Sequence, residues 1–270
     1  MVAPRHTMLW LALALGAGCA RPSATETAQA LVRRHREDEA VAALRDRLRA
    51  HPEDIAARRL LVRVLALTGD MLAARAEVDN LAQRMPVADP SPYIELGHAL
   101  ELAHRYDEAL EAYDRAAAVA PSRPDGPREG GLRCAHWGEA EQAASRLDEA
   151  VRRGARDAET WHALGLVRLN LADFDRAEQA YREAAAADPR APEGWLGLAT
   201  VALTRGDAQA ALNAYDELLV RRPRFAPAEL GRAWALSKLG RTDDAKRALD
   251  LAEELGAPPV NVARQRAALH

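Results

Sequence analysis

The sequence predicts an all-α protein built from one helix pair repeated along the chain. Hydrophobic residues make up 49% of the 270 residues, and most of them are alanine and leucine, whereas aromatic residues make up only 4%. Such a composition favours closely packed helices over sheets. A pattern of apolar residues also returns with a period of about 34 residues, which is the length of one helix-turn-helix unit. Because one pair cannot bury its own apolar face, the pairs are expected to stack into a solenoid.

The clearest unit covers residues 158–191. Most of its key positions match again one period later, from Trp195 to Pro223, and two periods earlier, from Tyr93 to Pro121. Alanine is so frequent in this chain that the aromatic residues, the Leu-Gly pairs and the prolines carry the argument. The key positions of the unit are Trp161, Leu164, Gly165, Ala177, Tyr181, Ala184 and Pro189.

This framework resembles the tetratricopeptide repeat (TPR) family, whose helix pairs form a right-handed solenoid with a concave groove. On that resemblance we expect six full units, preceded by a degenerate one within residues 19–54. Residues 260–270 are too few for another unit and are expected to form a capping helix. The six full units cover residues 55–88, 90–123, 124–157, 158–191, 192–225 and 226–259.

Each unit should contain two helices of roughly fourteen residues, each with an apolar stripe at helical spacing. Small residues such as Gly165 and Ala177 are expected to let the two helix axes approach closely, with Tyr181 filling the space beside them. Pro189 should end the second helix, because proline cannot continue the hydrogen-bond ladder. Acidic residues such as Asp173 stand where second helices begin, so we expect them to cap those helices.

The unit at 124–157 departs from the others, because Pro124, Pro127, Gly130 and Gly131 place helix breakers at its start. Each glycine inside a helix costs about 1 kcal/mol, and an interior proline costs more. We therefore expect the first helix of this unit to be short or late to start, and to act as a flexible joint.

Residues 1–18 resemble the signal peptide of a bacterial lipoprotein. An apolar run from Met8 to Ala17 is too short to span a bilayer as a mature helix. The segment from Leu15 to Cys19 resembles a lipobox, although glycine occupies the place of the usual leucine three residues before the cysteine. The resemblance implies that Cys19 carries the lipid. Alternatives are an ordinary signal peptide cut after Ala20 and a cytoplasmic protein. Alanine after the cysteine suggests the outer membrane, with the protein facing the periplasm and attached to the membrane by its lipid alone.

Composition and motifs argue against catalysis. A net charge of −3 and a pI near 6.3 provide no global field for binding nucleic acid. The sequence contains no glycine-rich phosphate loop, paired cysteine ligands or nucleophile elbow. His98 and His104 are spaced so that they fall on different faces of a helix, and Cys134 falls at a core position. We therefore expect no catalytic residue, metal, cofactor or small-molecule substrate, and the enzyme-class alternative is a regulatory subunit.

The TPR resemblance also implies a binding groove, lined by the first helix of each unit. The groove is expected to be an apolar track with a basic N-terminal end, holding an extended segment or an amphipathic helix of another envelope protein. The lysine and asparagine of the carboxylate clamp are not at their family positions. Alternatively, some of the leucines pack on a neighbouring helix or on a C-terminal segment. The candidate groove residues are Arg59, Arg63, Ile94, His98, Arg128, Leu132, His162, Leu166, Leu169, Leu196, Thr200, Leu203, Leu230 and Trp234.

These expectations favour a non-catalytic scaffold anchored in the cell envelope. A lipoprotein with TPR units is similar in architecture to the pilotins that help the type IV pilus secretin assemble. The alternative within the binding class is an adaptor that recruits peptidoglycan or polysaccharide enzymes. Because a fold does not identify its partner, the sequence leaves this choice open.

Overall fold

The computed structural model describes residues 23–86 and 88–269, so the leader and Cys19 lie outside the described residues. Within them the chain forms fifteen helices and no strand, which confirms the predicted all-α class. Fourteen of the helices form seven successive pairs, and α15 follows them. In chain order they are α1 (Ala24–Val32), α2 (Glu37–Ala50), α3 (Ile55–Thr68), α4 (Met71–Ala82), α5 (Ser91–Leu102), α6 (Tyr106–Val119), α7 (Asp125–Trp137), α8 (Ala140–Arg152), α9 (Ala158–Asn170), α10 (Phe174–Ala187), α11 (Pro192–Thr204), α12 (Ala208–Arg221), α13 (Ala226–Lys238), α14 (Thr242–Glu254) and α15 (Pro259–Ala267).

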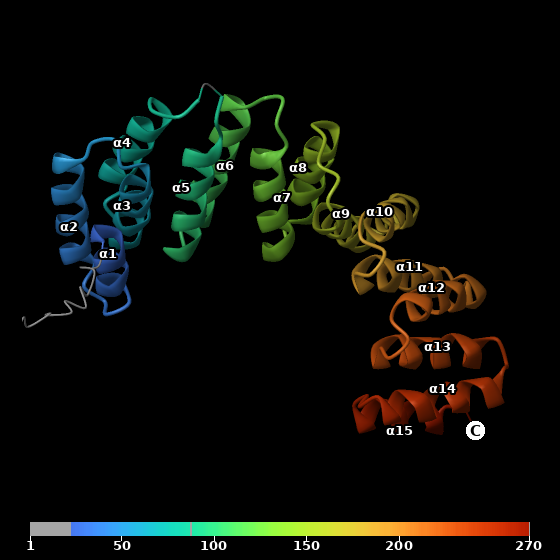
Figure 1. Cartoon of the computed structure of the whole chain (residues 1–270). Coiled ribbons are helices and arrows are strands. Elements are labelled where there is room, and N and C mark those ends of the chain that lie inside the picture. Colours follow the sequence, from blue (N-terminus) through green and yellow to red (C-terminus); the bar gives the residue numbers. More distant parts are fainter. Residues whose placement is uncertain (1–22, 87, 270) are drawn as a thin grey trace, which may run out of the picture.

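The helix pairs follow one another along an arch, with α1 and α15 near its two ends (Figure 1). Most first helices of neighbouring pairs contact one another, as α3 contacts α5 and α9 contacts α11. The second helices of the described pairs instead pack against first helices. Since the first helices are crowded more closely than the second, they lie on the inner, concave side of the solenoid.

Aspartate caps and prolines set many of the helix boundaries. The carboxylates of Asp54 and Asp157 accept hydrogen bonds from backbone N–H groups three residues on, at 2.9 and 3.0 Å. Asp173 caps α10 in the same way, which confirms its predicted role. Each cap stabilises its helix by about 1 kcal/mol. α10 ends at Ala187, two residues before Pro189, as the proline predicts.

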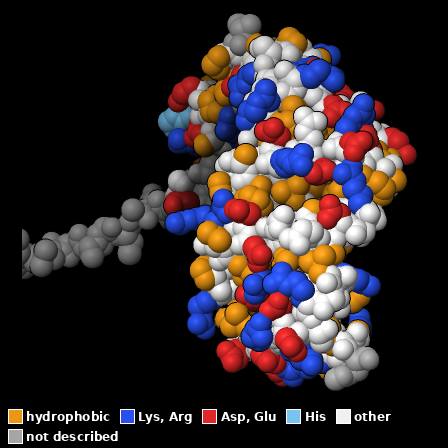
Figure 2. Space-filling view, turned by 90° about the vertical axis from the view of Figure 1, so that its right-hand side faces the viewer, with side chains coloured by type: hydrophobic (Ala, Val, Ile, Leu, Met, Phe, Trp, Pro, Cys, Tyr) orange, Lys and Arg blue, Asp and Glu red, His pale blue; other side chains and the backbone are white. Residues whose placement is uncertain are grey.

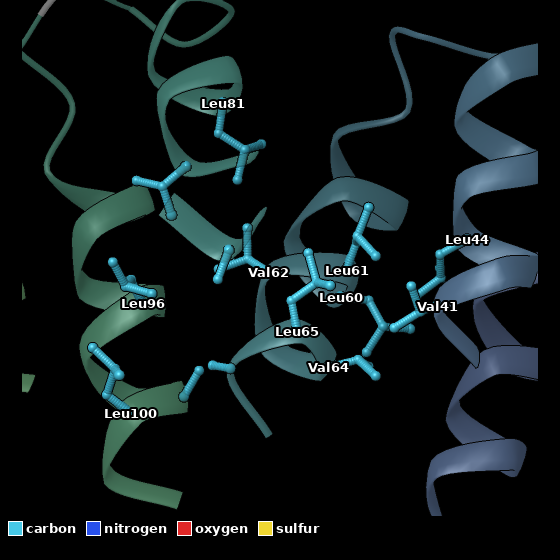
Figure 3. Packing of buried hydrophobic residues seen from close by; sticks show 14 of the residues in the cluster. Val41, Leu44, Leu60, Leu61, Val62, Val64, Leu65, Leu81, Leu96 and Leu100 are labelled. Carbon is cyan, nitrogen blue, oxygen red and sulfur yellow. The ribbon is translucent and has the colours of Figure 1, made fainter. Parts of the chain in front are cut away.

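The core consists of four clusters of mostly small and aliphatic side chains that follow one another between the helices. In the N-terminal part, α3 lies between α2 and α5, so that Leu44 and Leu96 lie on opposite sides of its leucines (Figure 3). Leu44 and Leu61 are fully buried. Burying a leucine side chain contributes about 1.5–3 kcal/mol, and such contacts recur in every pair.

Glycines bring the two helices of a pair together, as predicted. A Cβ at Gly165 would lie only 2.7 Å from Cδ1 of Tyr181, a distance that carbon atoms in contact do not reach. Tyr181 is also approached from the next pair, where a Cβ at Gly197 would lie 2.2 Å from the same atom. The ring of Tyr181 therefore lies between two glycines, one from its own pair and one from the next.

The first helix of the breaker-rich unit is complete, so the prediction that it is short or late to start is wrong. α7 has thirteen residues, as many as α9. Pro124 is its N-cap residue and Pro127 lies in the first turn, where a backbone N–H has no partner within the helix. A Cβ at Gly126 would lie 2.4 Å from the backbone nitrogen of Ala117. The glycines therefore allow close packing, which removes the reason to expect a flexible joint here.

Candidate functional site

The candidate site is the concave surface formed by the first helices. α3, α5 and α7 form its N-terminal half, and α9, α11 and α13 form its C-terminal half. Most candidate residues are partly exposed on these helices, with 41% of Leu166 and 37% of Trp234 open to solvent. Side chains at equivalent positions differ between the halves. The two halves therefore differ chemically although their helices are alike.

At the predicted basic end of the groove, two arginines share one carboxylate. Both Arg59 and Arg63 reach across to Glu95 of α5, with the guanidinium nitrogens 3.9 and 2.9 Å from its carboxylate oxygens. Arg59 also donates a hydrogen bond to the hydroxyl oxygen of Ser91 at 3.1 Å. Glu95 was not among the residues predicted from the sequence. It could have been found by looking for an acidic residue about one repeat after Arg63, because that spacing places it on the neighbouring first helix. The two arginines therefore link α3 to α5, and because they share a single carboxylate this end of the groove keeps a net positive charge.

Ion pairs continue across α5, α7 and the start of α9. Nε2 of His98 lies 3.1 Å from a carboxylate oxygen of Glu129. Arg128 is shared among three carboxylates, at 2.8 Å from Glu129, 2.9 Å from Asp157 and 2.5 Å from Glu159. Although partial burial opposes it, hydrogen bonding to Arg128 holds the pKa of Asp157 well below its usual range. The hydrogen bond from His98 lowers the pKa of Glu129, so both carboxylates are ionised at neutral pH.

The C-terminal half of the groove presents apolar side chains in place of ion pairs. Leu166 of α9 and Trp234 of α13 are exposed there. Leu169, Leu196, Leu203 and Leu230 are partly buried and also pack against the core, so the alternative that some groove leucines contact neighbouring helices holds for these four. The hydroxyl of Thr200 donates to the backbone oxygen of Leu196 at 2.8 Å, so it needs no other partner. Nζ of Lys238 lies 4.6 Å from the centre of the Trp234 ring, within range of a cation–π interaction.

A cavity of about 310 Å³ opens between the first turns of α9 and α11. Glu159, His162 and Glu193 line it, together with small residues that include Ala184 and Gly194. Burial lowers the pKa of His162, although the charge of Glu193 opposes that effect. The imidazole is therefore neutral at pH 7, and the charge in the cavity comes from carboxylates.

The outer side carries hollows whose charges pair with one another. One of about 290 Å³ lies between α10 and α12 over Trp195, on whose ring the Arg221 guanidinium stacks at 4.7 Å. Arg205 at its rim lies 2.6 Å from Glu178. Arginine and acidic side chains are likewise interspersed over the face shown in Figure 2, with apolar side chains between them. Such a surface offers no single-sign patch.

The described residues show no arrangement that suggests catalysis or metal binding. None of their histidine, cysteine and acidic side chains form a group of three that could hold a metal ion. His98 contacts Glu129, whereas Nδ1 of His104 lies 3.0 Å from the Tyr106 hydroxyl. Cys134 is fully buried, as predicted, and burial raises the pKa of its thiol. Among the described helices, none has the length and apolar character needed to cross a membrane.

Comparisons with known proteins agree with this architecture. A family model described as "Tetratricopeptide repeat" matches residues 25–91, 138–192 and 162–229, which together exceed half of the chain. No curated protein matches the chain. Three solved structures that it is similar to are 14–21% identical to it, so they show likeness of fold alone.

These three structures show the extent of the similarity. The C-terminal part of a TPR repeat-containing protein from Cytophaga hutchinsonii is 14% identical, with a TM-score of 0.65, over 89% of this chain and 98% of that one. YrrB, described as a TPR protein with an unusual peptide-binding site, is 17% identical, with a TM-score of 0.61, over 70% and 97%. MamA is 21% identical, with a TM-score of 0.58, over 63% and 93%.

Proposed function

The chain belongs to the tetratricopeptide repeat family, and on that premise we propose that it is a non-catalytic scaffold which holds a segment of another protein in the C-terminal half of its groove. Proteins of this family are in general interaction scaffolds. The observation that carries the proposal is the row of partly exposed leucines and Trp234 on α9, α11 and α13. Exposed apolar side chains in a row mark an interaction surface, and aromatic residues within such rows contribute most to binding.

YrrB supports this assignment, because it is described as a TPR protein with a peptide-binding site and its fold is similar. In the N-terminal half of this chain, a ligand would have to break ion pairs such as that of Arg63 with Glu95 before making contacts of its own. In the C-terminal half the leucines offer surface that binding would remove from water, at about 25 cal/mol for each Å² of apolar area. Binding is therefore favoured in the C-terminal half.

The proposal extends to the cell envelope through Cys19. This cysteine stands four residues before Ser23, the N-cap residue of α1. A lipid on Cys19 would hold the start of the solenoid within roughly 15 Å of the membrane surface. We propose an outer-membrane lipoprotein facing the periplasm, whose client is an envelope assembly such as a type IV pilus secretin. Support comes from the lipobox-like leader and the TPR architecture.

Crosslinking in cells followed by affinity purification tests the groove. Wild type would be compared with a variant carrying Leu196→Arg and Trp234→Ala, which adds a charge and removes the aromatic ring. Leu72→Arg is the matched control, because Leu72 is an exposed leucine on α4, outside the groove. We expect one envelope protein to be recovered with wild type and the control and lost with the groove variant. Equal recovery with all three would show that the groove is not the binding surface.

Metabolic labelling with a fatty-acid probe tests the anchor. Wild type should incorporate the probe and fractionate with membranes, whereas Cys19→Ser should do neither, because serine cannot form the thioether. Cys134→Ser provides the matched control, since Cys134 is the other cysteine and is buried in the core. An unlabelled wild-type protein would contradict the lipid anchor.

A further inference from the structure

The centre of the groove carries an excess of negative charge. Arg128 is the shared partner of Glu129, Asp157 and Glu159, so three carboxylates surround one guanidinium. Arg133 adds a second positive charge but lies 3.0 Å from Glu101. These arginines therefore do not balance the carboxylates around them, and the excess lies at the start of α9.

Glu193 extends this acidic region to the apolar track. It lies in the first turn of α11 and is exposed, as is Glu159 in the first turn of α9. Together with His162 they line the cavity of about 310 Å³ between these turns. Leu196 follows Glu193 by three residues, and Leu166 follows His162 by four, so each pair shares one face of its helix.

The opposite end of the track has the opposite charge. Lys238 lies at the end of α13, with its ammonium over the ring of Trp234. A cationic group in a bound segment would be repelled there and attracted at the cavity between α9 and α11. The charges therefore give the apolar track a direction, from the acidic first turns of α9 and α11 to the lysine of α13.

We propose that the segment held in the groove carries a lysine or arginine that enters the cavity beside Glu159 and Glu193, followed by apolar side chains that lie on Leu166, Leu196 and Trp234. This inference rests on the proposed function and names the chemistry of its partner. One helical residue rises about 1.5 Å, and an extended chain advances about 3.3 Å per residue. His162 at the cavity and Leu166 are four residues apart on α9, a rise of about 6 Å. The basic residue should therefore stand about two residues from the first apolar one in an extended segment, or about four in a helix.

Selection of phage-displayed twelve-residue peptides on the full chain provides the probe. We expect the peptides that bind wild type but not Trp234→Ala to share a basic residue near two or more apolar residues. A fluorescein-labelled peptide from this set would then be compared with its own lysine-to-glutamine or arginine-to-glutamine counterpart by fluorescence anisotropy. The affinity of wild type should fall about five- to tenfold on losing that basic residue, with the difference shrinking at high salt.

Two variants of the protein test whether Glu193 causes the preference for the peptide with the basic residue. Glu193→Gln should bind both peptides within about twofold of each other, because Glu159 is already paired with Arg128 and Glu193 supplies the charge that distinguishes the peptides. Glu141→Gln is the matched control, since Glu141 is also an exposed first-turn acid, but on the second helix α8. It should discriminate between the peptides as wild type does. Equal thermal unfolding midpoints for both variants would exclude a general loss of folding.

The outcomes separate this inference from the proposed function. Peptides that require Trp234 but have no basic residue, or whose affinity changes less than twofold without it, would overturn the inference and leave the groove function standing. A failure to recover any peptide that requires Trp234 would overturn the groove function and this inference with it.

Discussion

The two halves of the concave surface are built on the same helix framework and differ in what they expose. In the N-terminal half, side chains such as Arg63 and Arg128 bind carboxylates on the next first helix or at its start. In the C-terminal half the corresponding positions hold residues such as Leu166 and Trp234, with apolar surface open to solvent. The first half uses charged groove positions to link neighbouring pairs, whereas the second half leaves Leu166 and Trp234 open to solvent.

The comparison shows which positions the fold constrains and which it does not. Tyr113 in the N-terminal half and Tyr181 in the C-terminal half occupy equivalent places, each against a glycine of its own pair. In both units the glycine lets its helix approach the tyrosine ring closely. The groove positions vary more. Arg63 of the N-terminal half is charged, whereas Leu166 at the equivalent position of the C-terminal half is an exposed leucine.

The largest expected effect tests the shared framework. Gly97→Ala and Gly165→Ala should each destabilise the fold by roughly 2–3 kcal/mol, because a Cβ would lie 2.5 and 2.7 Å from a tyrosine ring. Alanine's better helix propensity returns only about 1 kcal/mol of this. Urea unfolding followed by circular dichroism measures both. Similar losses would confirm that the halves share one core design, whereas a loss in only one of them would break the comparison.

The next effect tests the difference in binding. Leu166→Arg should weaken binding of a selected peptide at least tenfold, because it places a charge in the apolar track. Arg63→Ala, at the equivalent position of the N-terminal half, should change the affinity by less than twofold. Fluorescence anisotropy with the same peptide measures both. A large loss with Arg63→Ala would move the binding surface into the N-terminal half.

Acid should weaken the ion pairs around α7 and α9. The folded-state pKa of Asp157 is depressed, so its contribution is present above the unfolded pKa, near 4, and is lost as pH falls below it. Asp157→Asn keeps a good cap but removes the charge, and should cost about 1 kcal/mol at pH 7, allowing for solvent screening. Unfolding measured from pH 7 to pH 2 should show the gap between wild type and variant closing below pH 4. A gap independent of pH would contradict the ion-pair explanation.

The smallest expected effect concerns α7, where breakers and a complete helix coexist. Hydrogen exchange should show residues 128–137 as well protected as residues 160–170, because the glycines of α7 are buried against α6 and α8. Mass spectrometry of peptides from the two segments gives the comparison. Markedly faster exchange in 128–137 would restore the idea of a flexible joint between the halves.

Local signals in the sequence predicted the helices well. Pro189 and Asp173 act on the backbone within a few residues, so their effects do not depend on distant packing.

The buried charged residues could not be predicted in the same way. Arg58 and Glu229 occupy the position that holds Trp161 and Trp195 in other units, yet both are more than nine-tenths buried. Arg58 pairs with Glu77, and burial raises the pKa of Glu229, contacts that only the packed structure specifies.

The sequence by itself determined the class, the repeat period, the glycines of close approach and the cap of α10, because each follows from residues a turn or a repeat apart. Tertiary structure decided the rest. Glycines that weaken an isolated helix become close contacts in α7 once α6 and α8 lie against it. Arg63 links two helix pairs because its guanidinium binds the carboxylate of Glu95. Glu95 is 32 residues away in the sequence, and only the packing of α3 against α5 brings the two side chains together. Composition counts charges, but only packing sets the distances at which they interact.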